Sequence, residues 1–351
     1  MRRRIGTTAA MTLAMMLVAA PALACGGLVG PKGTVNLLKT TTLAAYHDGI
    51  EHYVTSFTYA GAGGGKFGSI VPLPGVPTDV KKGGEWTLQR LLREVAPPLR
   101  APEGAVFALS ADAAKAEVLF ETKVDSLDIT VLRGGGSEVA TWAIDNGFEL
   151  SPDAPEMLDF YGARSPIFMA VRFNTDRAEA QGITSGQGTP VHVTIPTDDP
   201  WVPLRILALG REPGELVEAD VFLLTDRVPA MLPGPRNTSA AVNATGLELA
   251  RSEQAGELLM DDLRSDKGMG WMPDDMWLSY VTVSTAARDL RHDLAIDVTG
   301  GEPSWIDAGL AGLRASAEQA VTDATPAWVL STILALALAL MMLRRRSVPQ
   351  A

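Results

Sequence analysis

Cysteine is almost absent from this chain of 351 residues, in which Cys25 is the only one. One cysteine cannot form an intrachain disulfide, so the fold must be stabilised by its buried core. The chain also lacks a Gly-x-Ser-x-Gly sequence and contains four histidines in all. No local motif of a nucleophilic hydrolase is therefore present, although a catalytic triad can also be assembled from residues far apart in sequence.

Basic residues are in deficit, because 41 acidic residues face 30 lysines and arginines and give a formal net charge of −11. Six of the basic residues are arginines at the two ends of the chain, so the stretch between them carries a charge of about −17. A domain with this charge is repelled by phosphate backbones and by anionic lipid head groups. We therefore expect neither nucleic acid nor an anionic lipid surface as a partner.

A phosphate-binding loop is missing as well. The glycine-rich segment from Gly61 to Ser69 has three residues between Gly61 and Gly65, and Phe67 follows Lys66. A P-loop needs four residues between its glycines and a serine or threonine after the lysine. We interpret this segment as a hairpin connection, a role that glycine runs often have.

A long hydrophobic run is present near the C-terminus, from Trp328 to Leu343, and contains only two polar residues. With Pro326 and Ala327, a helix of this length comes close to the roughly 30 Å of a bilayer core. Three arginines follow at once, and positive charge is retained on the cytoplasmic side. We predict a transmembrane helix over 326–343, a cytoplasmic tail over 344–351, and an extracytoplasmic location for everything before the span.

The N-terminus has the features of a secretory signal peptide. Three arginines at positions 2 to 4 precede a mostly apolar run from Ala9 to Ala20, and Ala22-Leu23-Ala24 is a small-x-small cleavage site. We predict a signal peptide over 1–24 and cleavage between Ala24 and Cys25. Two alternatives stay open: a lipoprotein signal in which Cys25 carries lipid, and export by the twin-arginine route.

The region between these segments contains alternating strand and helix patterns. Asp48-Gly49 separates two strand patterns and predicts a hairpin, because Asp and Gly tolerate positive φ. The proline-containing stretch from Ser69 to Asp79 predicts a sheet edge or a surface connection. The expected strands are Val35 to Leu43, Ile50 to Tyr59, Ile129 to Leu132, Ile167 to Phe173, Val191 to Ile195, Leu204 to Leu209, Ala219 to Leu224 and Trp277 to Ser284.

Helical periodicity is expected over four stretches of the same region: Glu85 to Val95, Ser137 to Asn146 with Ser137 as N-cap and Gly147 as stop, Glu156 to Tyr161, and Leu247 to Leu263. A further helix, Trp305 to Val321, is expected within a juxtamembrane segment, 298–325. These patterns predict an α+β fold for an extracytoplasmic domain over 25–297, rich in antiparallel sheet with flanking helices. Whether 247–297 packs on the main sheet or forms a separate stalk stays open.

The strongest local candidate for a metal site is formed by His47, Glu51 and His52. Imidazole and carboxylate groups bind zinc, and a hairpin tip is accessible to an ion. Neighbouring strand residues point to opposite faces, however, and catalytic zinc normally has three converging protein ligands. The alternative is a set of solvated hairpin side chains, and we expect no cofactor.

Other polar residues suggest weaker sites. His292 beside Asp293 could act as a base with an orienting carboxylate, or could belong to a surface ion pair, and His192 is expected on one face of a strand. Three carboxylate pairs could bind a cation weakly, although none has the spacing of a calcium loop: Asp198-Asp199, Asp261-Asp262 and Asp274-Asp275. Four tryptophans could line a ligand groove or belong to a core: Trp201, Trp271, Trp277 and Trp305.

Several apolar motifs punctuated by proline and glycine carry a resemblance to a known family. They are Cys25-Gly26-Gly27, Asp48-Gly49, Ile70 to Gly75, Trp142 to Phe148, Phe168 to Arg172, Pro203 to Arg205 and Ala219 to Leu224. Together they resemble the bacterial domain of unknown function 2330 family over roughly Cys25 to Asp297. The resemblance implies an exported protein that often ends in a membrane span, and it implies no catalytic residues.

These observations favour a binding role over catalysis. We expect a membrane-anchored, single-pass module of the bacterial cell envelope that is structural or binds an envelope protein, with the lipid bilayer as its anchor. The alternative is an extracytoplasmic hydrolase or metal-binding enzyme whose site is assembled from residues far apart in sequence.

Overall fold

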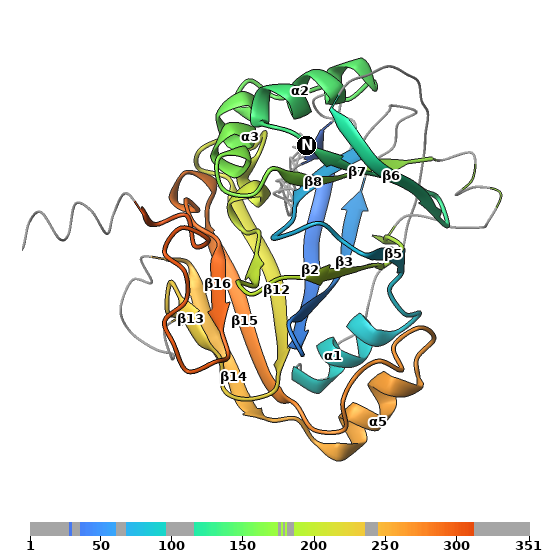
Figure 1. Ribbon diagram of the computed structural model, residues 1–351, viewed down its shortest axis with the longest axis vertical. Coiled ribbons are helices and arrows are strands. Elements are labelled where there is room, and N and C mark those ends of the chain that lie inside the picture. Colours follow the sequence, from blue (N-terminus) through green and yellow to red (C-terminus); the bar gives the residue numbers. More distant parts are fainter. Residues whose placement is uncertain are drawn as a thin grey trace, which may run out of the picture.

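The computed structural model describes residues 28–29, 36–60, 68–95, 116–174, 177, 180, 186–235 and 245–311, which form three β-sheets with helices around them (Figure 1). The predicted signal peptide with Ala24 and Cys25, the predicted span 326–343 and the predicted tail lie outside these residues. Within the described ranges, no helix is long and apolar enough to cross a membrane.

The largest sheet has eight strands and includes the predicted hairpin. Asp48 and Gly49 have φ values of 51° and 76°, which confirms the tight turn between its two long strands. Its strands run in the order β14 (Leu247–Gln254), β15 (Trp277–Ala286), β12 (Leu216–Thr225), β2 (Asn36–His47), β3 (Ile50–Ala60), β10 (Val191–Pro196) and β5 (Asp79–Lys82), with β9 (Gly186–Gln187) beside β3. Strand β2 pairs with β12 in parallel, so this sheet is mixed.

The second sheet has five antiparallel strands, in the order β1 (Leu28–Val29), β4 (Gly68–Pro72), β8 (Ile167–Phe173), β7 (Leu127–Arg133) and β6 (Glu117–Val124). The prediction that Ser69 to Asp79 lies at a sheet edge or on the surface was wrong for β4, because this strand lies between β1 and β8 and all five of its residues are buried. Pro72 is tolerated there because it is the last residue of the strand.

A third, small sheet contains β11 (Trp201–Val202), β16 (Leu294–Asp297) and β13 (Ala230–Leu232). Between β11 and β12, the chain forms a 3₁₀ helix, η1 (Arg205–Ala208), and a second one, η2 (Ala287–Asp289), follows β15. The strand predicted over Leu204 to Leu209 was therefore wrong. A short apolar run does not distinguish a buried strand from a buried helical turn by its periodicity.

Three of the predicted helices are present as α1 (Thr87–Val95), α2 (Gly136–Asp145) and α3 (Ala154–Gly162). The N-cap of α2 is Gly135 and not Ser137, and the Glu138 carboxylate accepts the Gly135 N–H at 2.8 Å. The start of α1 is capped from a distance, because Asp266 accepts the backbone N–H groups of Glu85, Trp86 and Thr87.

The helix predicted over Leu247 to Leu263 was wrong in its first half. Strand β14 occupies Leu247–Gln254, and α5 (Glu257–Ser265) begins only after it. Leu247 and Leu249 pair with Val283 and Val281 of β15, so pairing with a neighbouring strand decides the conformation. This region therefore packs on the main sheet. Trp305 to Gly309 form turns, so the helix expected from Trp305 begins no earlier than Ala311.

Two buried clusters cover the two faces of the eight-stranded sheet. On one face, α1 and α5 contribute Leu88 and Leu259 to a cluster with Leu43, Phe222 and Leu278 of the sheet. The other face shares a single larger cluster with the five-stranded sheet, α2, α3 and the third sheet. Figure 1 shows α1 and α5 at one end of the molecule and α2 and α3 at the other. The fold is α+β, as predicted, with the mixed sheet between two covering layers.

Candidate functional site

The three residues of the predicted metal site are not brought together. His47 Nδ1 lies 2.7 Å from Asp226 Oδ1 at the hairpin tip, whereas Glu51 is fully buried in the strand that follows. His52 points to the opposite face of that strand from Glu51 and contacts His192. No group of three or more His, Cys, Asp or Glu side chains in the described part of the chain is placed to hold a metal ion.

His52 and His192 form a hydrogen-bonded pair beneath Trp271. His52 Nδ1 lies 2.9 Å from His192 Nε2, and the His52 ring stacks on the Trp271 indole with ring centroids 3.6 Å apart. The pKa of His52 is lowered to about 4 and that of His192 to about 3, mainly by burial and in part by the nearby Lys81 ammonium. Both imidazoles are therefore neutral at pH 7 and act as packing groups.

Acid is expected to destabilise the chain through His192, which is 1% exposed. Because its folded pKa lies below its unfolded value, the unfolded chain binds a proton that the folded chain does not, and stability falls as the pH drops below about 6.5. His192→Gln should remove up to about 1.4 kcal/mol per pH unit of this slope. Urea denaturation at pH 7, 6 and 5 measures the change of stability with pH in the natural chain and in His192→Gln. Equal slopes in the two proteins would contradict a buried, neutral His192.

Glu51 is a buried carboxyl group without hydrogen bonds from its side chain. Neither of its carboxyl oxygens has a hydrogen-bond partner among the described residues. Burial raises the pKa of Glu51 to about 8; the Trp201 backbone is near enough to lower it in part, but it does not form a hydrogen bond of normal geometry with either oxygen. Glu51 is therefore protonated at neutral pH and belongs to the core, and it does not serve as an exposed ligand.

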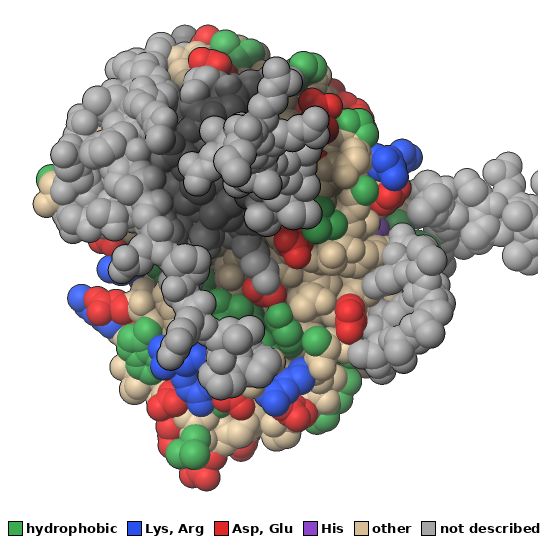
Figure 2. All heavy atoms as spheres, turned by 180° about the vertical axis from the view of Figure 1, so that it is seen from behind, with side chains coloured by type: hydrophobic (Ala, Val, Ile, Leu, Met, Phe, Trp, Pro, Cys, Tyr) green, Lys and Arg blue, Asp and Glu red, His purple; other side chains and the backbone are tan. Residues whose placement is uncertain are grey.

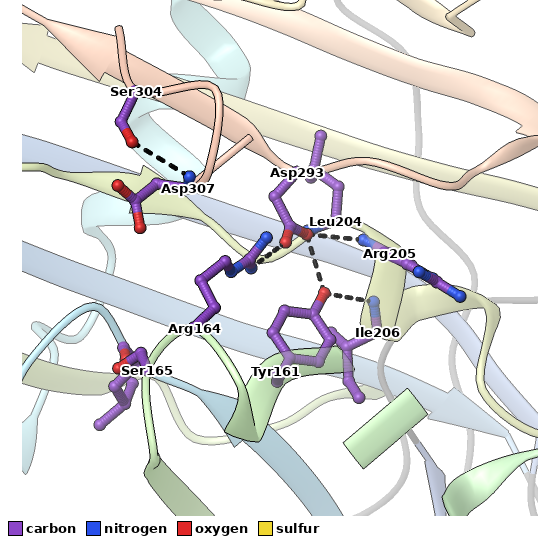
Figure 3. A network of polar contacts seen from close by, with 10 residues as sticks. Tyr161, Arg164, Ser165, Leu204, Arg205, Ile206, Asp293, Ser304 and Asp307 are labelled. Atoms are coloured by element: carbon purple, nitrogen blue, oxygen red, sulfur yellow. Dashed lines mark hydrogen bonds and ion pairs between the residues drawn. The ribbon is translucent and has the colours of Figure 1, made fainter. Parts of the chain in front are cut away.

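Asp293 is the centre of a buried polar network, shown in Figure 3. Its Oδ1 accepts the hydroxyl of Tyr161 at 2.8 Å and the backbone N–H groups of Leu204 and Arg205 at 2.6 and 2.8 Å. Its Oδ2 forms an ion pair with Arg164, whose side chain is also buried. The suggested pairing of His292 with Asp293 does not occur, because His292 Nε2 lies 3.0 Å from the Thr245 carbonyl oxygen.

Aromatic rings surround the cation of this network. The guanidinium carbon of Arg164 lies 4.3 Å from the ring centroid of Trp201 and 4.8 Å from those of Phe160 and Tyr161. Tyr161 also accepts the Ile206 N–H at its hydroxyl. The network therefore ties together α3, η1 and the loop before β16.

A groove of about 620 Å³, which we call the arginine groove, lies next to this network. Its walls are residues 151–157 at the start of α3, residues 205–213 from η1 onwards, and residues 287–291 at η2. Its floor is apolar, with Met157, Ala208, Ala287 and Leu290 all buried.

Four arginines line this groove, and two of them are held by glutamates. Arg205 binds Glu156 at 2.5 Å, and Arg211 binds Glu215 at 2.5 Å. Arg288 has a 60% exposed side chain, and its ion pair among the described residues is with the adjacent Asp289 at 3.6 Å. Arg291, which is exposed, donates its Nε–H to the Arg288 carbonyl and has no ion pair with a described carboxylate. Two guanidinium groups at the mouth are therefore available to a ligand.

Comparison with known families assigns the chain to one of them. Residues 19–250 match the family model described as an uncharacterized protein conserved in bacteria, DUF2330. The chain belongs to the DUF2330 family. The match ends before Arg288, Arg291 and Asp293, so one wall of the arginine groove lies beyond it.

No curated protein matches this DUF2330 chain. A crystal structure of baculovirus P35 covers 77% of the chain and 99% of its own length, with 11% sequence identity and a TM-score of 0.41. This degree of similarity carries no inference about function.

Sequence patterns did not indicate the groove of this DUF2330 protein. Its four arginines lie in two segments far apart in sequence, Arg205 with Arg211 and Arg288 with Arg291, and no local motif distinguishes them from solvated surface residues. The tryptophans singled out as a possible groove do not converge, because Trp201 stacks on Tyr161, Trp271 stacks on His52, and Trp277 donates to Ser252.

Proposed function

We propose that this DUF2330 protein is a membrane-anchored, extracytoplasmic binding module of the cell envelope, and that the arginine groove holds an acidic segment of a partner protein. The observation that carries the proposal is the pair Arg288 and Arg291, two exposed guanidinium groups beside an apolar floor. The predicted signal peptide and the predicted span over 326–343 would place the groove in the envelope.

The chemistry of the groove favours carboxylates. A guanidinium group binds a carboxylate through two parallel hydrogen bonds, which gives both attraction and orientation. An apolar side chain of the same segment would rest on Met157 and Leu290. On the face of the molecule drawn in Figure 2, basic side chains lie beside acidic ones. Four arginines line the groove against Asp153, Glu156 and Glu212, so one positive charge is in excess there in a chain with net charge −11. Arg291 has no ion pair with a described carboxylate, and Arg288 has only the exposed pair with Asp289.

The groove is also pre-organised. Asp293 contacts Arg164 of the loop after α3 and the start of η1, and it belongs to the loop that carries Arg291. A site whose walls are held by buried hydrogen bonds loses little conformational entropy when a ligand binds. A binding role fits this rigidity, whereas His292, the base suggested for a hydrolase, faces a backbone carbonyl.

The partner can be sought by photocrosslinking from the groove. A photoreactive phenylalanine analogue placed at Glu212, an exposed residue of the groove lining, leaves Arg288 and Arg291 in place. In the full-length chain in its native membrane it should give one discrete adduct whose crosslinked segment is rich in Asp and Glu. The same analogue at the exposed position of Arg227 serves as the control. Identical adducts from both positions, or a segment without acidic residues, would contradict the proposal.

Charge reversal tests the same contact without crosslinking. Arg288→Glu with Arg291→Glu should weaken binding of the identified segment at least tenfold, because two attractive charges become repulsive. Lysine substitutions at the acidic positions of the segment should restore binding to this variant. The matched control is Arg227→Glu with Lys267→Glu, which makes the same change in net charge at exposed positions outside the groove. Equal losses in the two double variants would mean that only long-range charge matters.

A further inference from the structure

A second cavity, of about 480 Å³, lies on the outer face of the five-stranded sheet. Strands β7 and β8 contribute Asp128, Thr130, Ala170 and Arg172 from one face, while the intervening Val171 is buried in the core. The opposite wall comes from α2 and the turn after it, through Trp142, Asn146 and Phe148. We call this cavity the basic pocket, and it shares no lining residue with the arginine groove.

Three cationic side chains in this pocket surround a single aspartate. Asp128 pairs across the sheet with Lys123 of β6 on one side and with Arg172 of β8 on the other. The Asp128 carboxylate is bound by Arg177 Nη1 at 2.9 Å. Arg172 is left without an ion pair to any described residue, and its other cross-strand neighbour is Gly68, which has no side chain.

The pocket also contains an unused buried donor. Arg177 Nη2 is buried and has no hydrogen-bond partner among the described residues, whereas Arg177 Nε donates to the Asp125 carbonyl oxygen. A buried N–H group without a partner is unfavourable, and in native proteins such a group is usually satisfied by water or a ligand. The lining holds Lys123, Arg172 and Arg177 against Glu121 and Asp128, so one positive charge is in excess.

From this geometry we infer that the basic pocket binds a small organic monocarboxylate with an apolar or aromatic body. The carboxylate would be held by the free guanidinium group of Arg172, with Lys123 nearby, and the body would lie against Trp142 and Phe148. The excess of one positive charge matches one carboxylate, and the cavity volume lies within the range of roughly 300–1,000 Å³ that is usual for small-molecule sites. Such sites usually have mostly apolar walls, whereas nine of the 13 residues that line this pocket are polar. Its apolar contacts are limited to Ile129, Trp142, Phe148 and Ala170, so the ligand body must be small.

Calorimetric titration of the full-length chain in detergent tests this inference. The probes are benzoate, phenylacetate and hexanoate, with benzamide and inorganic phosphate as comparisons. We expect at least one of the three carboxylates to bind with a 1:1 stoichiometry and benzamide to bind at least tenfold more weakly. Absence of binding by all three carboxylates at millimolar concentration, or preferential binding of phosphate, would overturn the inference.

The arginine variants assign any binding to this pocket. Arg172→Met should weaken carboxylate binding at least tenfold, and Arg172→Lys should give an intermediate value because it keeps the charge and loses the bidentate geometry. Arg133→Met removes a half-exposed arginine from the end of the same sheet, outside the pocket, and should leave affinity unchanged. If Arg172→Met fails to fold, the Arg172→Lys variant decides, and unchanged affinity in that variant would contradict the assignment. The groove variant Arg288→Glu with Arg291→Glu should bind the carboxylate normally, so that a failure of one proposed site is distinguishable from a failure of the other.

Discussion

Asp293→Asn is expected to destabilise the folded chain by about 3–5 kcal/mol, because it leaves the buried Arg164 cation without its counter-charge. The asparagine can still accept the backbone N–H groups of Leu204 and Arg205, so the loss reports mainly on the charge. Urea denaturation of the full-length chain measures the change in the free energy of unfolding. Because the same network holds the walls of the arginine groove in place, crosslinking from position 212 in the groove should fall in parallel.

Two further variants control this result. Arg164→Met combined with Asp293→Asn removes both charges and should be less destabilised than Asp293→Asn alone. Asp289→Asn changes an exposed carboxylate four residues before Asp293, outside the buried network, and should alter stability by less than about 0.5 kcal/mol. A change below 1 kcal/mol in Asp293→Asn itself would show that the Arg164–Asp293 pair is not isolated from solvent.

Glu51→Gln is expected to stabilise the chain at pH 7 by roughly 3 kcal/mol. The pKa of Glu51 is raised to about 8 in the folded chain, from about 4.5 in the unfolded chain, so the folded form retains a proton that the unfolded form releases between these values. The stability from this group is complete below pH 4.5 and is lost as the pH rises towards 8. Glutamine has nearly the same shape and needs no proton, so the penalty at pH 7 is absent.

The measurement is the pH dependence of unfolding between pH 5 and 8. Up to about 1.4 kcal/mol per pH unit of the downward slope should disappear in Glu51→Gln, while the exposed control Glu248→Gln should keep the slope of the natural chain. The His192 effect lowers stability as the pH falls below about 6.5, and the Glu51 effect lowers it as the pH rises above about 4.5, so the two effects oppose each other between these values. Each slope is therefore clearest in comparison with the variant that lacks the group. A Glu51→Gln variant no more stable than the natural chain at pH 7 would falsify the assignment of a buried, protonated carboxyl group.

Local signals predicted several elements correctly. The hairpin at Asp48-Gly49 follows from the few residues that tolerate positive φ, and α1 and α3 follow from apolar residues at helical spacing. Strand β6 was not predicted, because its side chains are mostly half-buried or exposed and show no regular alternation. The segment from Leu247 to Leu263 fits both a helical and a strand pattern of apolar residues. Pairing with β15 decided that its first half, up to Gln254, is a strand.

The candidate sites were predicted less well than the fold. His292 was a candidate base because Asp293 is its neighbour in sequence, yet the Asp293 carboxylate binds Arg164, 129 residues away. The arginine groove combines segments near residues 153, 208 and 288, and no spacing rule joins residues so far apart. His52 was a candidate metal ligand together with His47 and Glu51, whereas in the structure it contacts His192 from another strand of the sheet.

The sequence by itself determined the absence of an intrachain disulfide, the negative net charge and the positions of the hairpin and most helices. It also carries the predictions of a signal peptide and a membrane span, which fall outside the described residues. Only the tertiary structure decided that Glu51 is buried without a partner, that Asp293 binds Arg164, and which arginines remain free. The physical reason is the distance along the chain over which each effect acts. Backbone preferences and hydrophobic periodicity act over a few neighbouring residues, whereas burial and charge pairing depend on groups that only folding brings together.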